Sequence, residues 1–441
     1  MKFTRLSQIA HYLKLSVEER EIQGFSFDSR LVKPGDLFFA LKGEKFDGHD
    51  FLKEVAGKGV VAAVVSHQYK GESCGLVLLK VEDVTAALQT LAAALQAKRK
   101  QKVVGVTGSL GKTTTKEFIA TLLAQKYTVA KTPGNSNSQV GLPLAVLNGK
   151  GEEEIFVAEM GMNRAGEIER LTQIVPPDIA VVTKIGYPNF EFFADGFEGI
   201  ARAKAEIFSH PQTAIRILNR QVMQYEAFKK ETHSQLITYA LAPEMADFVL
   251  DQEIGWVVKE KGGCSPSFRL SFSANHLCEN FIGAVSVARI LGLSWEEIIR
   301  GAQLLKEAPL RFQRVEKEGI VFINDCYNAS PESMAAALSN LPVPRYGAKT
   351  IAVLGEMVHL GNHSEARHQG VAELALKNVD HLLCVGKGCL PMIEVFNKAG
   401  KPAQFFTDLK ELKSALFEIT KPGDVVLVKG SNSNKMWQIL E

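Results

Sequence analysis

Short apolar runs alternate with amphipathic stretches along most of the chain, a pattern typical of parallel sheets covered by helices. Clear apolar runs lie at residues 155–159, 179–183, 350–356 and 424–430. The segment MNRAGEIERLTQI, between the first two runs, has a helical spacing of apolar residues. Because strands that alternate with helices join through right-handed crossovers into parallel sheets, the pattern predicts an α/β protein.

Breaks in this pattern divide the chain into three predicted domains. The first part carries short apolar pieces separated by turn signals, as expected of a small α/β unit. A helix is predicted from Val84, and the polar segment KRKQK follows it before the next strand. We therefore expect a small N-terminal α/β domain at 1–81, a central domain with a mostly parallel sheet at 82–309, and a C-terminal Rossmann-like domain at 310–441.

Composition and charge narrow the class of protein. With 51 Lys and Arg against 49 Asp and Glu, the net charge of +2 gives no global attraction toward nucleic acid or an anionic membrane. The N-terminus lacks the apolar core of a signal peptide, and no run reaches the roughly 18 apolar residues of a membrane span. We therefore expect a cytoplasmic protein. Its six scattered cysteines predict reduced thiols rather than a zinc site.

Residues 103–115, VVGVTGSLGKTTT, carry the clearest chemical signal. An apolar run, then glycines and then Lys-Thr predict a strand that ends in a phosphate-binding loop at a helix N-terminus. Val106 stands where a strict Walker A motif has its first glycine, yet the two remaining glycines let backbone N–H groups approach phosphate oxygens. A glycine turn with a solvated lysine is the alternative. We expect a nucleoside triphosphate to contact Gly108, Ser109, Leu110, Gly111, Lys112, Thr113 and Thr114.

Glu159 is a candidate magnesium ligand. It ends the apolar run that follows the loop, and a carboxylate at the carboxyl edge of a neighbouring parallel strand faces the same crevice. The hydroxyl of Thr113 is a second candidate. An exposed glutamate at a strand end is the alternative for Glu159.

In GFEGIARAKAEIF, Lys204 shares a helical stripe with Ile200 and Phe208, whereas Arg202 and Glu206 are expected to pair on the other face. Lys204 is therefore predicted to point toward the core. Burial disfavours the charged amine, and a neutral amine can react with carbon dioxide to give a carbamate. A lysine that packs its stem and extends its head to water is the alternative.

Several segments, in order along the chain, resemble the Mur ligase family. TGSLGKTTTKE at 107–117 is similar to the family's ATP loop, and DSRLVKPGDLFFALKGEKFDGHDF at 28–51 resembles a UDP-binding block. NDCYNASPESM, VLGEMVHLGNHS and VLVKGSNSNKM resemble C-terminal signatures of the branch that adds a dipeptide. The Asp-Asn-Pro-Arg motif expected of a diaminopimelate-adding relative is absent.

The resemblance implies an ATP-dependent amide ligase of peptidoglycan precursor synthesis. Such an enzyme phosphorylates the terminal carboxylate of UDP-N-acetylmuramoyl-tripeptide and joins it to D-alanyl-D-alanine, using ATP and two Mg²⁺ ions that screen the repulsion between carboxylate and triphosphate. We expect a monomer without a nucleic-acid partner. Another amino-acid ligase of the superfamily, similar to folylpolyglutamate synthase, and a non-catalytic binder of nucleotide and peptide are the alternatives.

The resemblance also implies residue roles. Catalysis is expected from Lys112, Glu159 and Lys204, with Lys204 matching the family's carbamylated lysine. The metal ligands would be Thr113, Glu159, Lys204 and Asn189, which replaces the family's histidine. Further ATP contacts would be His276, Asn280, Arg311 and Asp325. Substrate contacts would be Ser29, Arg30, His49, Asn135, Asn137 and Asn328.

Three further residues depart from the family's pattern. Ser138, Lys184 and Leu277 each stand where the family has an asparagine. Arg311 and Asp325 lie in a different predicted domain from the loop, so their contact with ATP would require the two domains to come together.

Overall fold

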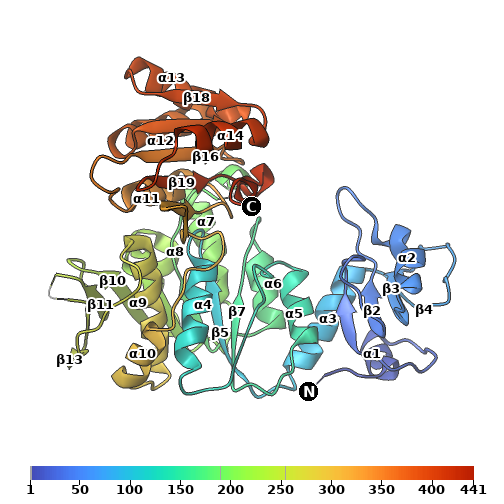
Figure 1. The fold of residues 1–441 in the computed structure, drawn as a ribbon. Coiled ribbons are helices and arrows are strands. Elements are labelled where there is room, and N and C mark those ends of the chain that lie inside the picture. Colours follow the sequence, from blue (N-terminus) through green and yellow to red (C-terminus); the bar gives the residue numbers. More distant parts are fainter. Residues whose placement is uncertain (1, 189, 254) are drawn as a thin grey trace.

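The computed structural model describes residues 2–188, 190–253 and 255–441 and contains three sheets, one in each predicted domain range (Figure 1). The α/β class with mostly parallel sheets is confirmed. The domain limits themselves stay predictions. Helix α3 (Val84–Gln96), which follows the first predicted limit, packs against both the N-terminal and the central domain.

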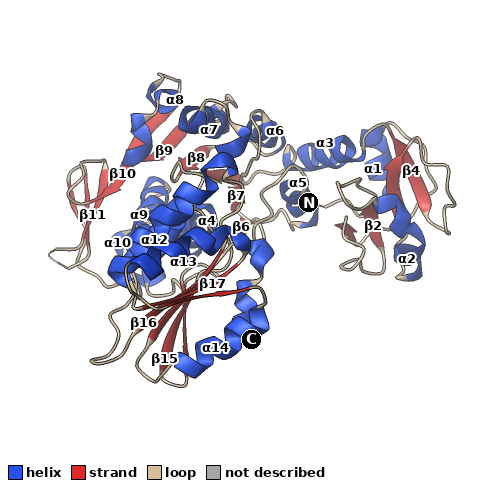
Figure 2. Ribbon diagram, turned by 90° about the horizontal axis from the view of Figure 1, so that it is seen from above, coloured by secondary structure: helices blue, strands red, loops and turns tan. Residues whose placement is uncertain are grey.

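The N-terminal domain is a parallel sheet in the order β1-β2-β3-β4. Its strands are β1 (Gly24–Ser26), β2 (Asp36–Phe39), β3 (Ala62–Ser66) and β4 (Val77–Val81), and its helices are α1 (Leu6–Leu13) and α2 (Leu52–Gly57). The domain stands to one side of the central sheet (Figures 1 and 2). The Asn148 amide joins the two domains, since it donates to the Phe25 carbonyl at 2.9 Å and accepts from the Phe25 N–H at 3.1 Å.

The central domain has a sheet in the order β13-β12-β11-β10-β9-β8-β5-β7-β6. Only β12 and β13 pair antiparallel to their neighbours. The strands are β5 (Lys102–Thr107), β6 (Val129–Lys131), β7 (Ile155–Glu159), β8 (Ile179–Val182), β9 (Ile215–Asn219), β10 (Gln235–Leu241), β11 (Phe248–Asp251), β12 (Val257–Glu260) and β13 (Gly263–Cys264). Parallel strands place their carboxyl ends at one edge, where a ligand crevice is expected.

Helices cover both faces of this sheet because its central strands are apolar on both sides. Val104 and Val106 of β5 pack with α4 (Lys112–Leu123) and α9 (Asn275–Ile290), whereas Val103 belongs to the cluster on the opposite face. That opposite cluster contains α5 (Gly141–Asn148), α6 (Glu167–Ile174) and α7 (Gly196–Ala205). The remaining α-helices of the domain are α8 (Glu226–Lys229) and α10 (Trp295–Ala302).

The expected pair between Arg202 and Glu206 is wrong. Helix α7 ends at Ala205, and Arg202 forms its ion pair with Asp195. The Glu206 carboxylate instead accepts hydrogen bonds from the backbone N–H groups of Gly166 at 2.7 Å and Glu169 at 3.3 Å. These groups begin α6, and the unsatisfied N–H groups and positive dipole of a helix start attract a carboxylate.

The C-terminal domain has the sheet order β14-β15-β19-β16-β17-β18, and only β14 runs antiparallel (Figure 2). The strands are β14 (Gln313–Lys317), β15 (Ile320–Asn324), β16 (Thr350–Gly355), β17 (His381–Val385), β18 (Ala403–Phe406) and β19 (Val425–Lys429). The helices are α11 (Pro331–Ser339), α12 (Ser364–Asn378), α13 (Leu390–Lys398) and α14 (Leu409–Ile419). This domain sits over the carboxyl edge of the central sheet (Figure 1).

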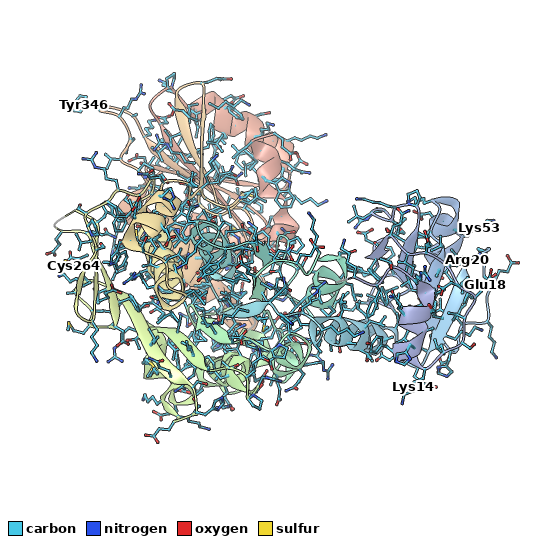
Figure 3. All side chains as sticks on the ribbon, turned by 90° about the horizontal axis from the view of Figure 1, so that it is seen from below. Lys14, Glu18, Arg20, Lys53, Cys264 and Tyr346 are labelled. Atoms are coloured by element: carbon cyan, nitrogen blue, oxygen red, sulfur yellow. The ribbon has the colours of Figure 1, made fainter. Side chains whose placement is uncertain are left out.

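The surface carries charges of both signs. Lys14, Glu18, Arg20 and Lys53 extend outward from the N-terminal domain (Figure 3). All six cysteines are free thiols; Cys264 is exposed, and Cys278, Cys326, Cys384 and Cys389 are buried. Within the described ranges, no helix combines the length and apolar character needed to cross a membrane.

Candidate active site

A cavity of about 330 Å³ lies between the carboxyl edge of the central sheet and the C-terminal domain. Most of the residues predicted for nucleotide and catalysis meet there, although they come from distant parts of the chain. The predicted residues that line it are Ser109, Leu110, Gly111, Lys112, Thr113, Thr114, Asn137, Glu159, His276, Asn280, Arg311, Asp325 and Asn328.

The loop between β5 and α4 requires both of its glycines. Gly108 and Gly111 have positive φ angles of 148° and 82°. A Cβ atom on Gly108 would lie 2.0 Å from Thr183 Oγ1, and one on Gly111 would lie 2.4 Å from Asn280 Oδ1. Neither backbone conformation nor space is therefore available to a larger residue. The glycines also allow the loop to lie directly above α4, whose first N–H groups form an anion site.

Lys112 begins α4 and folds back over the loop. Its Nζ donates to the Gly108 carbonyl at 2.8 Å and lies 3.3 Å from the Ser109 carbonyl oxygen. Burial lowers the pKa of Lys112, and the Arg311 charge acts in the same direction. The ammonium is thus held at the centre of the loop, where a bound phosphate would offset both positive charges.

Glu159 ends β7 and is almost completely buried. Its Oε1 accepts hydrogen bonds from Asn137 Nδ2 at 2.7 Å and Thr113 Oγ1 at 3.2 Å. Its Oε2 has no hydrogen-bond partner among the described residues. A buried carboxylate oxygen left free beside a hydroxyl and a phosphate loop fits a magnesium ligand.

Magnesium would find few other protein ligands. The described part of the chain has no cluster of three or more His, Cys, Asp or Glu side chains able to hold a metal. Mg²⁺ commonly uses one or two protein oxygens together with water and substrate phosphates, so Thr113 and Glu159 suit that mode. Asn189, another of the predicted metal ligands, lies outside the described residues.

Lys204 is buried on α7 with 2% of its surface exposed, which confirms its predicted inward direction. It does not line the cavity. Burial lowers its pKa well below the ordinary value, and the Lys112 charge adds to this effect. Its Nζ makes no hydrogen bond with any described residue. Burial therefore favours the neutral amine over the ammonium.

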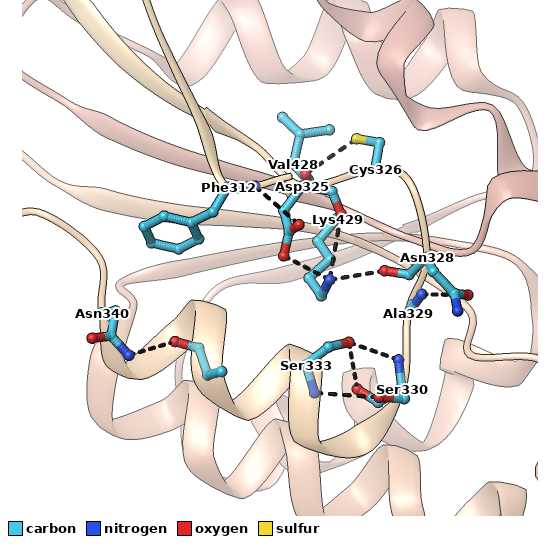
Figure 4. A network of polar contacts seen from close by, with 11 residues as sticks. Phe312, Asp325, Cys326, Asn328, Ala329, Ser330, Ser333, Asn340, Val428 and Lys429 are labelled. Carbon is cyan, nitrogen blue, oxygen red and sulfur yellow. Dashed lines mark hydrogen bonds and ion pairs between the residues drawn. The ribbon is translucent and has the colours of Figure 1, made fainter. Parts of the chain in front are cut away.

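The C-terminal domain contributes an ion pair to the cavity (Figure 4). Lys429 Nζ donates to Asp325 Oδ2 at 2.7 Å and to the Asn328 carbonyl at 2.8 Å, while Asp325 Oδ1 accepts from the Phe312 N–H at 3.1 Å. The buried Lys429 thereby fixes both Asp325 and the turn before α11. Cys326 nearby donates its thiol to the Val428 carbonyl, and burial raises its pKa to about 12, so it is no nucleophile.

Contacts across the domain junction close the cavity. Arg311 Nη2 donates to Thr113 Oγ1 at 3.3 Å, and its guanidinium lies 3.7 Å from the centroid of the Tyr327 ring. Glu332 at the start of α11 accepts from the Tyr187 N–H at 2.8 Å. The meeting of Arg311 with the loop, expected from domain closure, is thus present in this structure.

His276 and Asn280 lie on the first turns of α9. Burial lowers the pKa of His276 to about 4, so the imidazole is neutral at pH 7. Its Nδ1 has no hydrogen-bond partner among the described residues, and its ring meets the Phe312 ring edge-on at 4.8 Å. Asn280 Oδ1 accepts from Thr115 Oγ1 at 3.2 Å. Both side chains can therefore contact a nucleotide above α4.

The sequence reasoning missed several cavity residues. Lys429 is one of them, although its segment VLVKGS was recognised as a family signature. Lys184 and Glu279 also line the cavity and form an ion pair at 2.5 Å. Lys184 stands where the family has an asparagine, and this difference could have indicated a charged residue at the site. The sequence around Lys184 does not indicate that Glu279 is its partner.

The predicted substrate residues of the N-terminal domain are not among those that line the cavity. The Arg30 guanidinium donates two hydrogen bonds to the Asp28 carboxylate, at 2.8 Å and 2.6 Å. His49 Nδ1 lies 2.6 Å from Asp47 Oδ1, and its Nε2 accepts from the Ser66 N–H at 2.9 Å. The roles of these residues, and those of Ser29 and Asn135, stay predictions.

Comparisons with known proteins cover almost the whole chain. Family models described as Mur ligase family catalytic domain, Mur ligase middle domain and Mur ligase glutamate ligase domain match residues 21–96, 106–288 and 310–432. The UDP-N-acetylmuramoyl-tripeptide–D-alanyl-D-alanine ligase of Bacillus subtilis is 32% identical, over 96% of this chain and 93% of its own. The Escherichia coli enzyme of the same name is 31% identical, over 99% and 97%.

Solved structures agree with these sequence matches. MurF from Acinetobacter baumannii has a TM-score of 0.84 and 29% identity, covering 98% of this chain and 97% of its own. MurF ligase from Thermotoga maritima in complex with ADP has a TM-score of 0.80 and 31% identity, covering 95% and 96%.

Proposed function

The chain belongs to the Mur ligase family, and we propose that it is the ATP-dependent ligase that joins D-alanyl-D-alanine to UDP-N-acetylmuramoyl-tripeptide. The observation that carries this proposal is the similarity to enzymes of that name over all three domains. The reaction forms an amide bond in peptidoglycan precursor synthesis. A cytoplasmic monomer is the proposed working form.

The arrangement of the cavity suits the main electrostatic difficulty of this reaction. A substrate carboxylate has to approach a triphosphate, and the two anions repel each other. Lys112 and Arg311 both point at the loop, so the site supplies two positive charges before any ligand binds. Mg²⁺, held by Thr113 and Glu159, would add charge neutralisation at the transferring phosphoryl group.

The chain's own groups then position each reactant. The α4 N-terminus and Lys112 bind the phosphates, so that the γ-phosphorus faces the incoming carboxylate oxygen. A new O–P bond forms as the bond to ADP breaks, which gives an acyl phosphate. The amine of D-alanyl-D-alanine then attacks the acyl carbon, a proton leaves the nitrogen, and inorganic phosphate departs. Asn137, which lines the cavity and hydrogen-bonds Glu159, would orient the acyl donor.

Lys204 is proposed to act as a carbamate. Its low pKa leaves a nucleophilic amine, and reaction with carbon dioxide converts a buried base into an anion near Lys112 and Glu159. Nuclear magnetic resonance with carbon-13 bicarbonate should show a carbamate signal that disappears in Lys204→Ala. A wild-type spectrum without that signal contradicts the modification while leaving the ligase reaction untouched.

Phosphate release provides the decisive test of function. With ATP and Mg²⁺, release should require both UDP-N-acetylmuramoyl-tripeptide and D-alanyl-D-alanine. Tight binding of these ligands without any release would instead support a non-catalytic binder. Release that requires glutamate and a folate would support the alternative ligase class. Running the assay with lysine- and diaminopimelate-containing tripeptides would define the acyl donor.

A further inference from the structure

Lys116 is a buried lysine to which neither the sequence motif nor the proposed reaction assigns a role. It lies on α4, one turn beyond Lys112, and its side chain has 0% of its surface exposed. An ammonium removed from water is costly unless several acceptors surround it. Lys116 Nζ has such acceptors, because it donates to the Thr132 carbonyl at 2.8 Å and to the Gly134 carbonyl at 2.5 Å.

Both carbonyls belong to segment 132–137, which connects β6 to α5. The same segment is tied to the end of β7. Thr132 Oγ1 accepts from the Glu159 N–H at 3.1 Å, and Asn137 Nδ2 donates to Glu159 Oε1 at 2.7 Å. Lys116 therefore anchors one end of a segment whose other end orients the Glu159 carboxylate.

Lys116 also acts on Glu159 directly. Its Nζ lies 3.7 Å from Glu159 Oε2, close enough for attraction but too far for a hydrogen bond. The two backbone carbonyls hold the ammonium back at this distance. Glu159 Oε2 is consequently the oxygen that stays without a hydrogen-bond partner among the described residues. A nearby positive charge thus stabilises the carboxylate without forming a hydrogen bond to Oε2, which stays free to accept a metal ion.

We propose that Lys116 is a positioning residue that fixes segment 132–137 and Glu159 in the geometry required by Mg²⁺ and the acyl donor. This inference rests on the proposed function for the identity of the ligands. A lysine needed only for folding would affect stability, whereas a positioning residue also changes how tightly those two ligands bind. The phosphate loop has its own contacts, so binding of metal-free ADP should depend little on Lys116.

Lys116→Met removes the charge and keeps the length of the side chain. Calorimetric titrations would measure ADP affinity at increasing Mg²⁺ concentrations. The Mg²⁺ concentration that gives half of the gain in ADP affinity should rise about tenfold or more, because removing a group that orients a metal ligand typically has an effect of this size. The dissociation constant of UDP-N-acetylmuramoyl-tripeptide should rise by a similar factor. The dissociation constant of ADP without Mg²⁺ should change by less than about twofold.

Lys131→Met is the matched control. Lys131 directly precedes segment 132–137 and forms an ion pair with Glu117, as Lys116 does. Its side chain is exposed, however, and its Nζ is hydrogen-bonded to Glu117 rather than to that segment or to Glu159. This variant should bind all three ligands like the wild type. Lower thermal stability of Lys116→Met with unchanged Mg²⁺ and tripeptide binding overturns the proposal.

Two further variants keep the test decisive if Lys116→Met does not fold. Thr132→Val removes only the hydroxyl that accepts from Glu159, and it should raise the Mg²⁺ requirement by roughly threefold, a typical cost of one hydrogen bond. An unchanged requirement in this variant contradicts the positioning role. Where Lys116→Met folds, the double variant Lys116→Met/Asn137→Ala should lose little more tripeptide affinity than Lys116→Met alone, because both changes disturb segment 132–137 and Glu159. Fully additive losses of tripeptide affinity would contradict the proposal.

These binding measurements need no turnover. If the wild type releases no phosphate but shows Mg²⁺-dependent ADP binding, the proposed ligase reaction fails while the role of Lys116 can still be judged from the nucleotide titrations alone.

Discussion

The nucleotide cavity and the N-terminal surface predicted to bind uridine diphosphate are built in opposite ways. The cavity draws buried charges from two domains, and residues such as Arg311 and Lys429 are held by partners far away in sequence. On the N-terminal surface, Arg30 and His49 are each paired with a residue two positions away. The geometry of the cavity depends on contacts between two domains, whereas the geometry of the N-terminal surface depends on contacts within single turns.

This difference determines what a mutation costs. Removing a buried charge leaves its partners without solvation, so effects at the cavity should be large and should spread to neighbouring groups. An exposed pair is screened by water and contributes little to stability. Changes on the N-terminal surface should therefore reduce affinity for one substrate without altering the rest of the molecule. The variants below test this contrast.

Lys204→Ala should have the largest effect. Loss of a group that supports the metal region is expected to lower turnover by at least about a thousandfold, which corresponds to several kcal/mol of transition-state stabilisation. Added bicarbonate should not restore activity. Arg202→Ala, on the exposed side of the same helix, is the control and should retain the wild-type rate. Near-normal phosphate release by Lys204→Ala would remove this residue from the reaction.

Arg311→Ala should raise the KM for ATP by about ten- to a hundredfold, because a charge-assisted contact across the junction is lost. The KM for UDP-N-acetylmuramoyl-tripeptide should change much less. Arg314→Ala, an exposed arginine on the following strand, provides the control in steady-state kinetics. Equal increases in both KM values would show that the two sites are not independent.

His276 should make stability depend on pH. Burial lowers its folded-state pKa to about 4, while an unfolded histidine titrates near 6.5. The unfolded state therefore binds the proton first, and stability falls as the pH drops through 6.5 toward 4. Between pH 7 and pH 5 this group should account for about 2 kcal/mol of lost stability. Urea unfolding should show a shallower pH dependence in His276→Asn, and parallel curves would contradict the assignment.

Arg30→Ala should have the smallest effect. We expect the KM for UDP-N-acetylmuramoyl-tripeptide to rise by about three- to tenfold, with the KM for ATP and the thermal stability unchanged, because water screens an exposed pair. Lys53→Ala, also on the exposed surface of this domain, is the control (Figure 3). An unaltered tripeptide KM in Arg30→Ala would place the uridine site elsewhere.

Local patterns were sufficient for the fold and for the phosphate loop. The apolar run at 155–159 is strand β7, and the helix predicted from Val84 is α3. The glycines at 108 and 111 were identifiable because a phosphate loop requires positive φ angles and close backbone approach, both of which favour glycine. Lys204 was correctly directed inward because a helical stripe has a fixed period.

Contacts between residues far apart in the sequence could not be predicted from local patterns. The hairpin of β12 and β13 has no strong alternation, and it was not predicted. The Arg202–Glu206 pair failed because the helix ended one residue earlier and another helix start attracted Glu206. Lys116 and Lys429 were missed because their acceptors are mainly backbone carbonyls, which leave no mark in a sequence.

The two hydrogen bonds between the Asn148 amide and the Phe25 backbone restrict how the N-terminal domain is positioned against the central domain. They join the end of α5 to the edge of the first sheet, so they oppose a change in the span from the surface predicted to bind uridine diphosphate to the phosphate loop. An extended residue covers about 3.3 Å, and a peptide shortened by one residue would leave its terminal carboxyl group short of the loop by that amount. If the predicted uridine site is correct, this joint is expected to favour one peptide length without any contact to the side chains of the peptide.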